Sequence, residues 1–389
     1  MKNLETLIQE LCPDGVEFVK IGEVAKVGTG SSNRQDAVDD GKYPFYVRSK
    51  NILASDTYEF DDESIIIPGE GGIGEIFHYV KGKYALHQRV YRINFYDERI
   101  NVKFVYYYMY SCFKRFIMKK AVSATVTSIR KPMIEKFEFP LPPIEVQTEI
   151  VRILDKFTSL EAELEAELDC RKRQYEYYRD KLLSFDNVGG QEVEWKKMSE
   201  VCKNICSGGT PLTSKAEYYD GNIPWLRTQE VDYCEIHSTL RNITQLGLKN
   251  SSAKMIPANC VIVAMYGATA AKVAINKIPL CTNQACCNLE IDEKQALVRY
   301  VYQWICKQYE VLKAMGEGSQ HNINAKKVKD FKIPIPTLEE QNRIVSILDR
   351  FESLTTSLQS GLPAEISARR QQYEYYRDKL LTFKRKGAA

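Results

Sequence analysis

The chain reads IEKFEFPLPPIEVQTEIVRILDKFTSL from Ile134 and VKDFKIPIPTLEEQNRIVSILDRFESL from Val328. Prolines, a glutamine, a Leu-Asp pair and several apolar residues match in register between these two segments. The decapeptide QYEYYRDKLL then occurs unchanged at Gln174–Leu183 and at Gln372–Leu381, with four extra residues before the second copy. A repeat of this length is beyond coincidence, so the chain is built as two tandem units that each carry one copy.

Each copy predicts a long helix after a proline-rich extended stretch. Proline cannot propagate a helix, but Pro143 fits the start of one. From Ile150 the first copy has no Pro or Gly until Gly189, and its apolar residues recur nearly always at spacings of three and four, with an exception around Arg171. About 40 residues at a rise of about 1.5 Å give a helix of roughly 60 Å. In the second copy, Gly361-Leu362-Pro363 predicts a break or kink.

The apolar stripe on each helix needs a partner in water. We expect the two helices to pack on each other as an antiparallel intramolecular coiled coil with pseudo-two-fold symmetry, because one chain supplies both. A coiled coil with another chain is the alternative. The residues expected to form the helix seam and partner surface are Phe157, Leu160, Leu164, Leu168, Tyr175, Tyr178 and Leu182 in the first helix and Phe351, Leu354, Leu358, Tyr373, Tyr376 and Leu380 in the second.

The parts of the chain before the two helices resemble each other more weakly. EFVKIGEV from Glu17 parallels EWKKMSEV from Glu194, and KYPFYVRS around Pro44 parallels NIPWLRTQ around Pro224. The duplication therefore includes the globular parts, and each unit is a variable globular domain followed by a shared helix.

Short alternating or β-branched runs in the globular parts indicate strands, and residues 102–119 and 297–315 indicate helices at corresponding places. We therefore expect an α+β chain with two globular α/β domains in tandem, separated by two long helices, and with twisted, mostly antiparallel sheets. The expected segments are 1–144 for the first globular domain, 145–186 for the first helix, 187–337 for the second globular domain, and 338–389 for the second helix and the C-terminal tail.

Composition describes an ordinary globular protein, with 44% hydrophobic and 27% charged residues and a net charge of +3. Met1–Leu11 carries Glu5 and Glu10 within an apolar pattern, so it predicts a short amphipathic helix and not a signal peptide. No apolar run approaches the roughly 18 residues needed to span a membrane. We therefore expect a cytoplasmic protein without a membrane partner. The acidic run at 161–169 would repel phosphate, so a DNA contact should lie elsewhere.

Eleven cysteines without a secretory signal are best interpreted as reduced thiols. The groups Cys202/Cys206 and Cys281/Cys286/Cys287 lack CxxC spacing, and the four histidines form no ligand pattern with them. We expect no metal site.

Motifs for catalysis are also missing from the sequence. Gly69-Glu70-Gly71-Gly72-Ile73-Gly74 matches GxGxxG, but the alternating residues that follow predict a hairpin where a dinucleotide site needs a helix. There is no GxxxxGK[ST] phosphate loop and no Asn-Pro-Pro-aromatic segment, and Pro13-Asp14 with Glu17 has the wrong spacing for a nuclease. We therefore interpret the glycine-rich stretch as a structural turn and the chain as a non-enzyme.

Polar, basic patches in the variable parts are the candidates for DNA binding. Arg can bond bidentately to guanine and Asn or Gln to adenine, while hydroxyls and Lys more often hold phosphates. Each patch alone is typical of a solvated loop, but the patches recur at matching places in both units. The candidates are Arg48, Ser49, Lys50, Asn51, His87, Gln88, Arg89, Thr125, Thr127, Ser128, Arg130 and Lys131 in the first unit and Gly209, Thr210, Arg227, Thr228, Gln229, Asn283, Gln284, Ser319, Gln320, Asn322 and Lys326 in the second.

Taken together, these features resemble the specificity subunits of type I restriction–modification systems over nearly the whole chain. The most specific elements are the two proline-rich helix starts and the two decapeptides. In the second unit, Gly208-Gly209-Thr210-Pro211, Asn283-Gln284 and 318–323 also resemble elements of the family's recognition domains. The first unit departs from this pattern with Gly30-Ser31-Ser32 and His87-Gln88.

The resemblance implies that each variable domain binds one half of a bipartite site in double-stranded DNA. It also implies that two methyltransferase subunits using S-adenosylmethionine dock on the helices, and that up to two motor–endonuclease subunits add ATP- and Mg²⁺-dependent cleavage. The chain itself would bind no cofactor and would act as reader and assembly core.

The length of the first helix also suggests that it sets the distance between two half-sites on DNA. Two half-sites read from one face of DNA lie about one turn apart, roughly 34 to 36 Å. Glu161-Ala162-Glu163-Leu164 is repeated directly as Glu165-Ala166-Glu167-Leu168. Four helical residues add about 6 Å and about 40° of rotation. We hypothesise that deleting one tetrad shortens the gap between half-sites by about one base pair.

Two alternatives stay open from the sequence. One is an adaptor or scaffold that holds partner proteins without reading DNA. The other is a fused modification enzyme, which would methylate DNA unaided when given S-adenosylmethionine. Salt-dependent binding to a bipartite duplex separates the first alternative from a reader.

Overall fold

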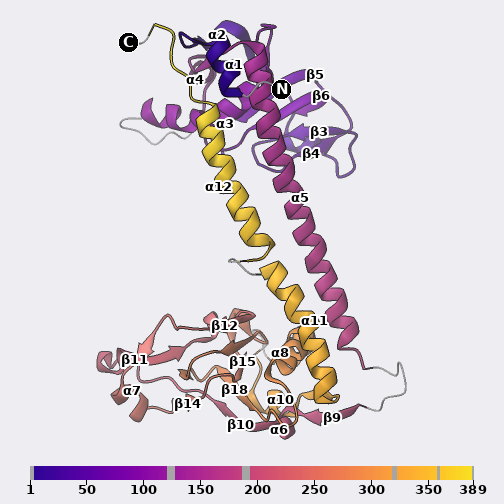
Figure 1. Cartoon of the computed structure of the whole chain (residues 1–389), viewed down its shortest axis with the longest axis vertical. Coiled ribbons are helices and arrows are strands. Elements are labelled where there is room, and N and C mark those ends of the chain that lie inside the picture. The colour runs from indigo at the N-terminus through magenta and orange to yellow at the C-terminus, as the bar shows by residue number, and fades with distance from the viewer. Residues whose placement is uncertain (1–3, 121–127, 186–192, 318–321, 357–359, 388–389) are drawn as a thin grey trace. The chain divides into compact units, whose positions relative to one another are not determined.

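The computed structural model describes residues 4–120, 128–185, 193–317, 322–356 and 360–387 (Figure 1). The chain divides into two compact units. Unit 1 comprises Met1–Glu165 and Glu365–Ala389, and unit 2 comprises Ala166–Ala364. Each unit combines one globular part with segments of two different helices. The division into the four sequence segments 1–144, 145–186, 187–337 and 338–389 therefore stays a prediction.

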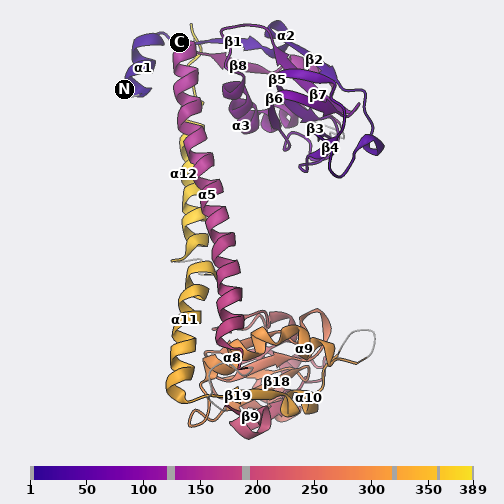
Figure 2. The same cartoon turned by 90° about the vertical axis from the view of Figure 1, so that its right-hand side faces the viewer.

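Unit 1 is built on a six-stranded mixed sheet. Its strands follow the order β2 (Ala25–Thr29), β7 (Val90–Phe95), β5 (Phe60–Pro68), β6 (His78–Leu86), β3 (Tyr43–Tyr46) and β4 (Leu53–Ser55). All neighbours are antiparallel except β3 and β6, which run parallel. The helix α3 (Val102–Lys120) packs against one face of this sheet (Figure 2), where Phe104 and Met109 are fully buried with Ile65 and Ile93.

Smaller elements complete unit 1. The helix α1 confirms the short amphipathic helix expected at the start of the chain. The C-terminal segment returns to this region, since Lys386 N–H donates to the Val16 carbonyl (2.9 Å) and Val16 N–H donates to the Lys384 carbonyl (2.9 Å). The elements are α1 (Leu4–Leu11), β1 (Glu17–Lys20), which pairs antiparallel with β8 (Glu138–Leu141), α2 (Ile21–Val24), the 3₁₀ turn Arg34–Asp36, and α4 (Lys131–Glu135).

Unit 2 repeats this plan with the sheet divided in two. A five-stranded sheet follows the order β10 (Cys202–Ser207), β18 (Cys286–Ile291), β15 (Val261–Ala264), β16 (Val273–Asn276) and β12 (Cys234–Ile236). A four-stranded sheet follows the order β13 (Asn242–Ile243), β11 (Tyr219–Leu226), β17 (Leu280–Thr282) and β14 (Met255–Ile256). The remaining elements are β9 (Glu194–Lys197), which pairs with β19 (Lys332–Ile335), α6 (Met198–Val201), α7 (Gln245–Lys249), α8 (Val298–Lys307), α9 (Tyr309–Ala314), α10 (Ala325–Asp330) and the 3₁₀ turns 216–218, 228–230 and 267–269.

The expectation of one helix over 297–315 is wrong in one respect, because this stretch forms two helices, α8 and α9. The backbone leaves the helical conformation at Gln308, where φ is −90° and ψ is 17°, and α9 begins at the next residue. No Gly or Pro marks this break, so the sequence carried no local signal for it. The stretch 102–119 is confirmed as one helix, α3.

The first shared helix, α5 (Ile144–Leu182), has 39 residues and starts one residue before the expected segment 145–186. Gln147 is completely buried and fixes this start. Its side-chain oxygen accepts from Asn101 N–H (2.8 Å), and its amide donates to the carbonyls of Pro142 (2.7 Å) and Arg99 (2.8 Å). Because this amide satisfies buried backbone groups before and beside the helix, it joins the helix to the globular part.

The same buried glutamine recurs in unit 2. Gln341 accepts from Leu297 N–H (2.9 Å) and donates to the carbonyls of Pro336 (2.9 Å) and Gln295 (3.1 Å). The matching glutamines of the two sequence copies therefore make equivalent contacts, which extends the duplication from sequence to structure.

The second shared segment is two helices, α11 (Leu338–Thr356) and α12 (Leu362–Leu380), so the break expected near Gly361-Leu362-Pro363 is confirmed. Pro363 lies in the first turn of α12, where a missing N–H costs nothing. No helix among the described residues is long and apolar enough to cross a membrane.

Within each unit, α5 packs against a helix of the second copy (Figures 1 and 2). In unit 1, Phe157 stacks on Tyr376 with ring centroids 5.6 Å apart, while Arg370 forms ion pairs with Glu161 and Glu165. Later residues of α5 thus meet earlier residues of α12, so this pair is antiparallel. In unit 2, Tyr178 of α5 stacks on Phe351 of α11 at 5.4 Å.

Most of the expected seam residues that the structure describes are half-buried. Tyr178, Leu354 and Tyr376 are more open, at 39% exposed each. The half-buried ones are Phe157, Leu160, Leu164, Leu168, Tyr175, Leu182, Phe351, Tyr373 and Leu380. Leu358 lies outside the described residues.

Candidate nucleic-acid interface

The candidate site of unit 1 forms where strands β6 and β5 end. His87 follows β6, and its N–H donates to the carbonyl of Tyr46 at the end of β3 (3.0 Å). Gly69 follows β5, and its N–H donates to the carbonyl of Arg89 (3.0 Å). Its own carbonyl accepts from Ile129 N–H (2.7 Å). Four separate segments are thereby joined at one edge of the sheet.

The candidate site of unit 2 has the same framework. Asn283 N–H donates to the carbonyl of Leu226 (2.9 Å), and Met265 N–H donates to the carbonyl of Ala285 (2.8 Å). The Met265 carbonyl accepts from Ile323 N–H (2.8 Å). These bonds match those of unit 1 one for one, so equivalent positions in the two sites can be assigned from backbone contacts.

A glycine packs tightly against this framework in each unit. A Cβ atom on Gly30 would overlap the carbonyl oxygen of Leu86, and one on Gly208 would overlap that of Thr282. Leu86 and Thr282 are themselves equivalent, because each ends its strand beside the parallel neighbour. Both glycines are therefore required for close approach of backbone to backbone.

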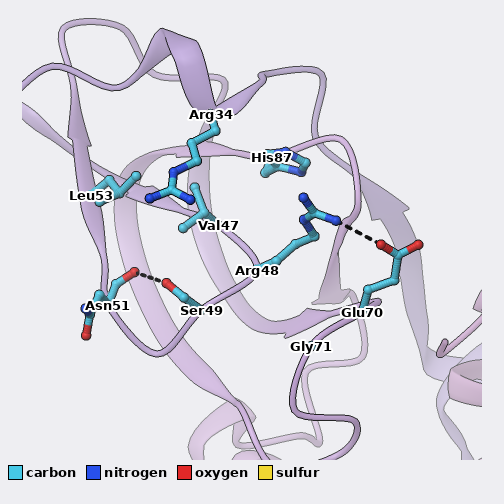
Figure 3. Close-up of a pocket in the computed structure, with 9 residues that line it drawn as sticks. All are labelled: Arg34, Val47, Arg48, Ser49, Asn51, Leu53, Glu70, Gly71 and His87. Carbon is cyan, nitrogen blue, oxygen red and sulfur yellow. Dashed lines mark hydrogen bonds and ion pairs between the residues drawn. The ribbon is translucent and has the colours of Figure 1, made fainter. Parts of the chain in front are cut away.

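In unit 1 the framework surrounds a cavity of about 390 Å³ (Figure 3). Arg48 and Glu70 point toward each other at its edge, with Arg48 Nη1 2.9 Å from Glu70 Oε2. Arg89 Nη1 lies 3.1 Å from the same oxygen. One carboxylate thus holds two guanidinium groups. The residues that line the cavity are Arg34, Val47, Arg48, Ser49, Asn51, Leu53, Glu70, Gly71 and His87.

The charges in this site are well defined. Hydrogen bonds from Arg89 and Arg48 lower the pKa of the Glu70 carboxyl, so it is ionised at neutral pH. Burial lowers the pKa of His87, and the positive charges of Arg48 and Arg89 lower it further. His87 Nδ1 accepts from Arg89 N–H (3.0 Å), which leaves the ring proton on Nε2. The site presents a neutral imidazole donor beside a cationic cluster.

Unit 2 carries different chemistry on the same framework. Arg227 Nε and the Asn283 side-chain oxygen are buried without a hydrogen-bond partner among the described residues, and Arg227 Nε lies 3.9 Å from Glu230 Oε1 in an ion pair. Arg227 and Asn283 lie close in the fold, since Asn283 N–H bonds the residue just before Arg227. Thr210 Oγ1 bonds the side chain of Gln284. Unpartnered buried polar atoms favour a site that a polar ligand completes.

Five of the predicted unit 1 residues gather at the cavity. Arg48, Ser49, Asn51 and His87 line it, and Arg89 reaches its edge through Glu70. The Ser49 Oγ donates to the Asn51 carbonyl (3.0 Å), so its hydroxyl is held by its own loop.

The other predicted unit 1 residues that the structure describes do not line the cavity. Lys50 and Gln88 are exposed, and Gln88 donates to the side chain of Asn33 (2.5 Å). Ser128 is half-buried, while Arg130 is exposed before α4. Lys131 is exposed and forms an ion pair with Glu135 (3.6 Å). Thr125 and Thr127 lie outside the described residues.

The predicted unit 2 residues divide in the same way. Gly209 lies near Arg227, because its carbonyl accepts from Nε1–H of Trp225 (3.0 Å), two residues before Arg227. Gln229 and Lys326 are exposed. The Thr228 carbonyl accepts from the Thr269 hydroxyl (2.8 Å).

The last unit 2 candidates lie near residue 320. The Asn322 side-chain oxygen accepts from Gly267 N–H at 3.4 Å, which places this residue beside the turn after β15. Ser319 and Gln320 lie outside the described residues. DNA contact by any residue of either unit stays a prediction.

The sequence did not single out Glu70 or Arg34 as site residues. The glycine-rich stretch is the turn between β5 and β6, with φ of 76°, 65° and 66° at Gly71, Gly72 and Gly74, so its interpretation as a structural turn is confirmed. The same turn also carries Glu70 into the cavity. The only feature of the sequence that could have pointed to Glu70 was the position of this turn directly after a strand-like apolar run.

The cysteines and histidines in the described ranges form no cluster of metal ligands. No group of three or more His, Cys, Asp or Glu side chains is placed to hold a metal ion in the part of the chain that the structure describes. Burial raises the pKa of the Cys287 thiol to about 12 and that of Cys202 to about 12. These thiols are therefore protonated and unreactive at neutral pH.

Comparison with known proteins agrees with this geometry. The model of the type I restriction modification DNA specificity domain matches the chain twice, at residues 13–169 and 191–368. The specificity subunit of the type I restriction enzyme EcoR124I/EcoR124II of Escherichia coli is 40% identical over 299 residues, which cover 74% of this chain and 72% of that protein.

Solved structures show the same fold. The type I restriction–modification S subunit of M. genitalium matches with a TM-score of 0.60 at 17% identity, over 94% of this chain and 96% of that chain. A chain from work on complex assembly and conformational transition of the type I R-M system matches with a TM-score of 0.61 at 15% identity, over 95% and 98%. The two matched domains correspond to the two halves of the duplication, and they favour a DNA reader over an adaptor. This chain belongs to the DNA specificity subunits of type I restriction–modification systems.

Proposed function

We propose that each unit of this chain reads one half of a bipartite target in double-stranded DNA. The proposal rests on one observation: the two units share the same backbone hydrogen bonds at their candidate sites but carry different side chains there. His87 in unit 1 and Asn283 in unit 2 occupy one backbone position, yet one offers an imidazole and the other an amide. Two readers with one architecture and different donors suit two different half-sites.

The helices would set the gap between the half-sites. The antiparallel packing of α12 on α5 in unit 1 stiffens the part of α5 that contains the first acidic tetrad and Glu165, the first residue of the second tetrad. Arg370 reaches Glu161 and Glu165, which are the first residues of the two tetrads. These ion pairs also neutralise part of a run that would otherwise repel DNA.

Two methyltransferase subunits would dock on the helices, one for each copy of the decapeptide. Tyr177 is 60% exposed and its counterpart Tyr375 is 64% exposed. Each packs edge-on against the next tyrosine of its helix, with ring centroids 5.3 Å apart in both copies. Exposed tyrosines are typical of protein interfaces, and two identical patches suit two copies of one partner.

The chemistry would belong to the partners. S-adenosylmethionine would bind the methyltransferase subunits, and ATP and Mg²⁺ would bind motor–endonuclease subunits where these are present. This chain would bind none of these cofactors and would contribute recognition and assembly. Adenine methylation and ATP-dependent cleavage would be activities of the complete complex.

Methylome sequencing of a host with and without this chain tests the proposal. We expect one bipartite methylated motif that depends on the chain. Replacement of the first globular part by that of another specificity subunit should change one half of the motif only. A motif that changes in both halves, or in neither, would overturn the division between the units.

Native mass spectrometry of the purified complex tests the docking surfaces. Tyr177→Ala and Tyr375→Ala should each weaken binding of one methyltransferase subunit, and the double variant should weaken binding of both. Tyr96→Ala is a matched control, because Tyr96 is 65% exposed but lies outside the helices. Full occupancy in the double variant would place the docking surface elsewhere.

A further inference from the structure

The cationic cluster of unit 1 contains a carboxylate that a phosphate site would not need. Glu70 is ionised and lies at the cavity edge between Arg48 and Arg89. Its side chain is 39% exposed, so an approaching phosphate would be repelled by it. A G·C base pair, in contrast, presents both acceptors and a donor in the major groove.

We propose that Arg48, Glu70 and Arg89 together read one G·C base pair. The guanidinium groups would donate to guanine N7 and O6, and Glu70 would accept from the N4 amino group of cytosine. This inference rests on the proposed function, because it requires DNA to lie against the cavity of unit 1.

The backbone holds Glu70 in a defined place. Gly69 N–H bonds the carbonyl of Arg89 (3.0 Å), so the turn is fixed to the segment between β6 and β7 that carries this arginine. Gly71 has a φ of 76°, and a Cβ atom there would lie 3.2 Å from the carbonyl oxygen of Arg48. The turn is therefore in close contact with the backbone of both arginines. Preorganised donors and acceptors of this kind lose little entropy when they bind.

Unit 2 keeps the turn but replaces the side chains. Gly267 has a φ of 78° and stands where Gly71 stands in unit 1, so Tyr266 occupies the position of Glu70. Ala285 occupies the position of Arg89. The cluster is thus specific to unit 1, and its base pair belongs to one half-site only.

The test uses the full chain in its complete modification complex, with methylation of a duplex library that varies each position of the motif. Glu70→Ala should relax discrimination at one G·C position of one half-site by roughly 5- to 150-fold. Arg48→Ala and Arg89→Ala should relax the same position. Glu70→Tyr, which introduces the residue that unit 2 carries in the same turn, should do so as well and guards against misfolding of the alanine variant.

Glu75→Gln is the matched control. Glu75 lies at the other end of the same turn and pairs with Lys114, away from the cavity lining. This variant should leave the motif unchanged.

The outcomes separate this inference from the proposed function. Equal weakening at all positions, with a salt dependence reduced by about one phosphate contact, would overturn base reading and leave the division between the units intact. Relaxation at different positions by the three residues would also overturn it. Failure of the wild-type complex to methylate any bipartite motif would instead overturn the proposed function.

Discussion

His87 and Asn283 occupy the same position in the two units. Each follows the end of a strand, and each donates its backbone N–H to the last residue of the parallel neighbour, Tyr46 or Leu226, at 3.0 Å and 2.9 Å. The side chain at this position is therefore set by the same backbone in both units, while its hydrogen-bonding groups differ. This makes the two residues a direct probe of the separate readers.

Asn283→Ala should impair recognition of one half-site only. Its buried side-chain oxygen has no partner in the described part of the chain, so a base or an ordered water would satisfy it in the complex. We expect a roughly 5- to 150-fold loss of discrimination at one position in a methylation assay with a varied duplex library. His87→Ala is the companion variant and should affect the opposite half. Effects of both variants on the same half would contradict separate reading.

Gly30→Ala should destabilise unit 1 by about 1–3 kcal/mol, because the added methyl group overlaps the Leu86 carbonyl and forces the strand end to shift. Gly28→Ala is the matched control in the adjoining strand, where a Cβ atom meets nothing within 4 Å. Thermal unfolding of the two variants measures the difference. Equal midpoints would show that this close approach is not required.

The charge network of unit 2, in which Arg299 and Glu352 are each 22% exposed and Asp349 is 39% exposed, should matter more than its counterpart in unit 1. Arg299 lies 2.6 Å from Asp349 and 2.7 Å from Glu352, with its side chain 22% exposed. Arg299→Ala would leave two carboxylates together, and we expect a loss of about 3 kcal/mol. Lys103 pairs with Asp155 at 2.8 Å, but both side chains are about one-third exposed, so Lys103→Ala should cost about 1 kcal/mol or less.

Chemical denaturation of the full chain compares these two variants. The reverse order of stability loss would contradict the assignment of burial in the two networks.

Stability should fall in mild acid partly because of His87. Its pKa in the folded chain lies below the ordinary value of 6.5, chiefly through burial. The unfolded chain therefore binds the proton more readily, and the stability contributed by the neutral ring is present above pH 6.5 and is lost as the pH falls below it. His87→Asn installs the residue found at the equivalent position of unit 2 and removes this titration.

Melting temperatures at pH 7 and pH 5 provide the measurement. The decrease should be smaller in His87→Asn than in the wild type, although His78, whose pKa burial also lowers, retains part of it. Parallel curves for the two proteins would exclude a contribution from His87.

Deletion of one Glu-Ala-Glu-Leu tetrad should shorten the gap in the methylated motif by about one base pair. Four residues span about 6 Å of helix, which equals one to two base-pair rises of about 3.4 Å, so the gap should shorten by at least one base pair. Glu165→Ala with Leu168→Ala alters the tetrad without changing the helix length and should preserve the gap. An unchanged gap in the deletion variant would show that α5 does not set the spacing.

The sequence by itself determined the duplication, the two shared helical segments and the break near Gly361. These depend on local periodicity, on prolines and on exact repetition, all of which are visible along the chain. The same repetition pointed to matching sites around His87 and Asn283. Four predicted residues of unit 1 line the cavity and a fifth, Arg89, lies at its edge, although their contact with DNA stays a prediction.

Only the tertiary structure decided which segments meet. Phe157 contacts Tyr376 and Tyr178 contacts Phe351, so α5 is shared between two compact units. The cavity likewise joins Arg48, Glu70 and Arg89 from three separate strand ends and turns. Pairing between residues distant in the chain depends on sheet register and backbone hydrogen bonds. Sheet register and long-range backbone hydrogen bonds cannot be predicted from local residue patterns. For that reason the sequence indicated only a turn at Glu70.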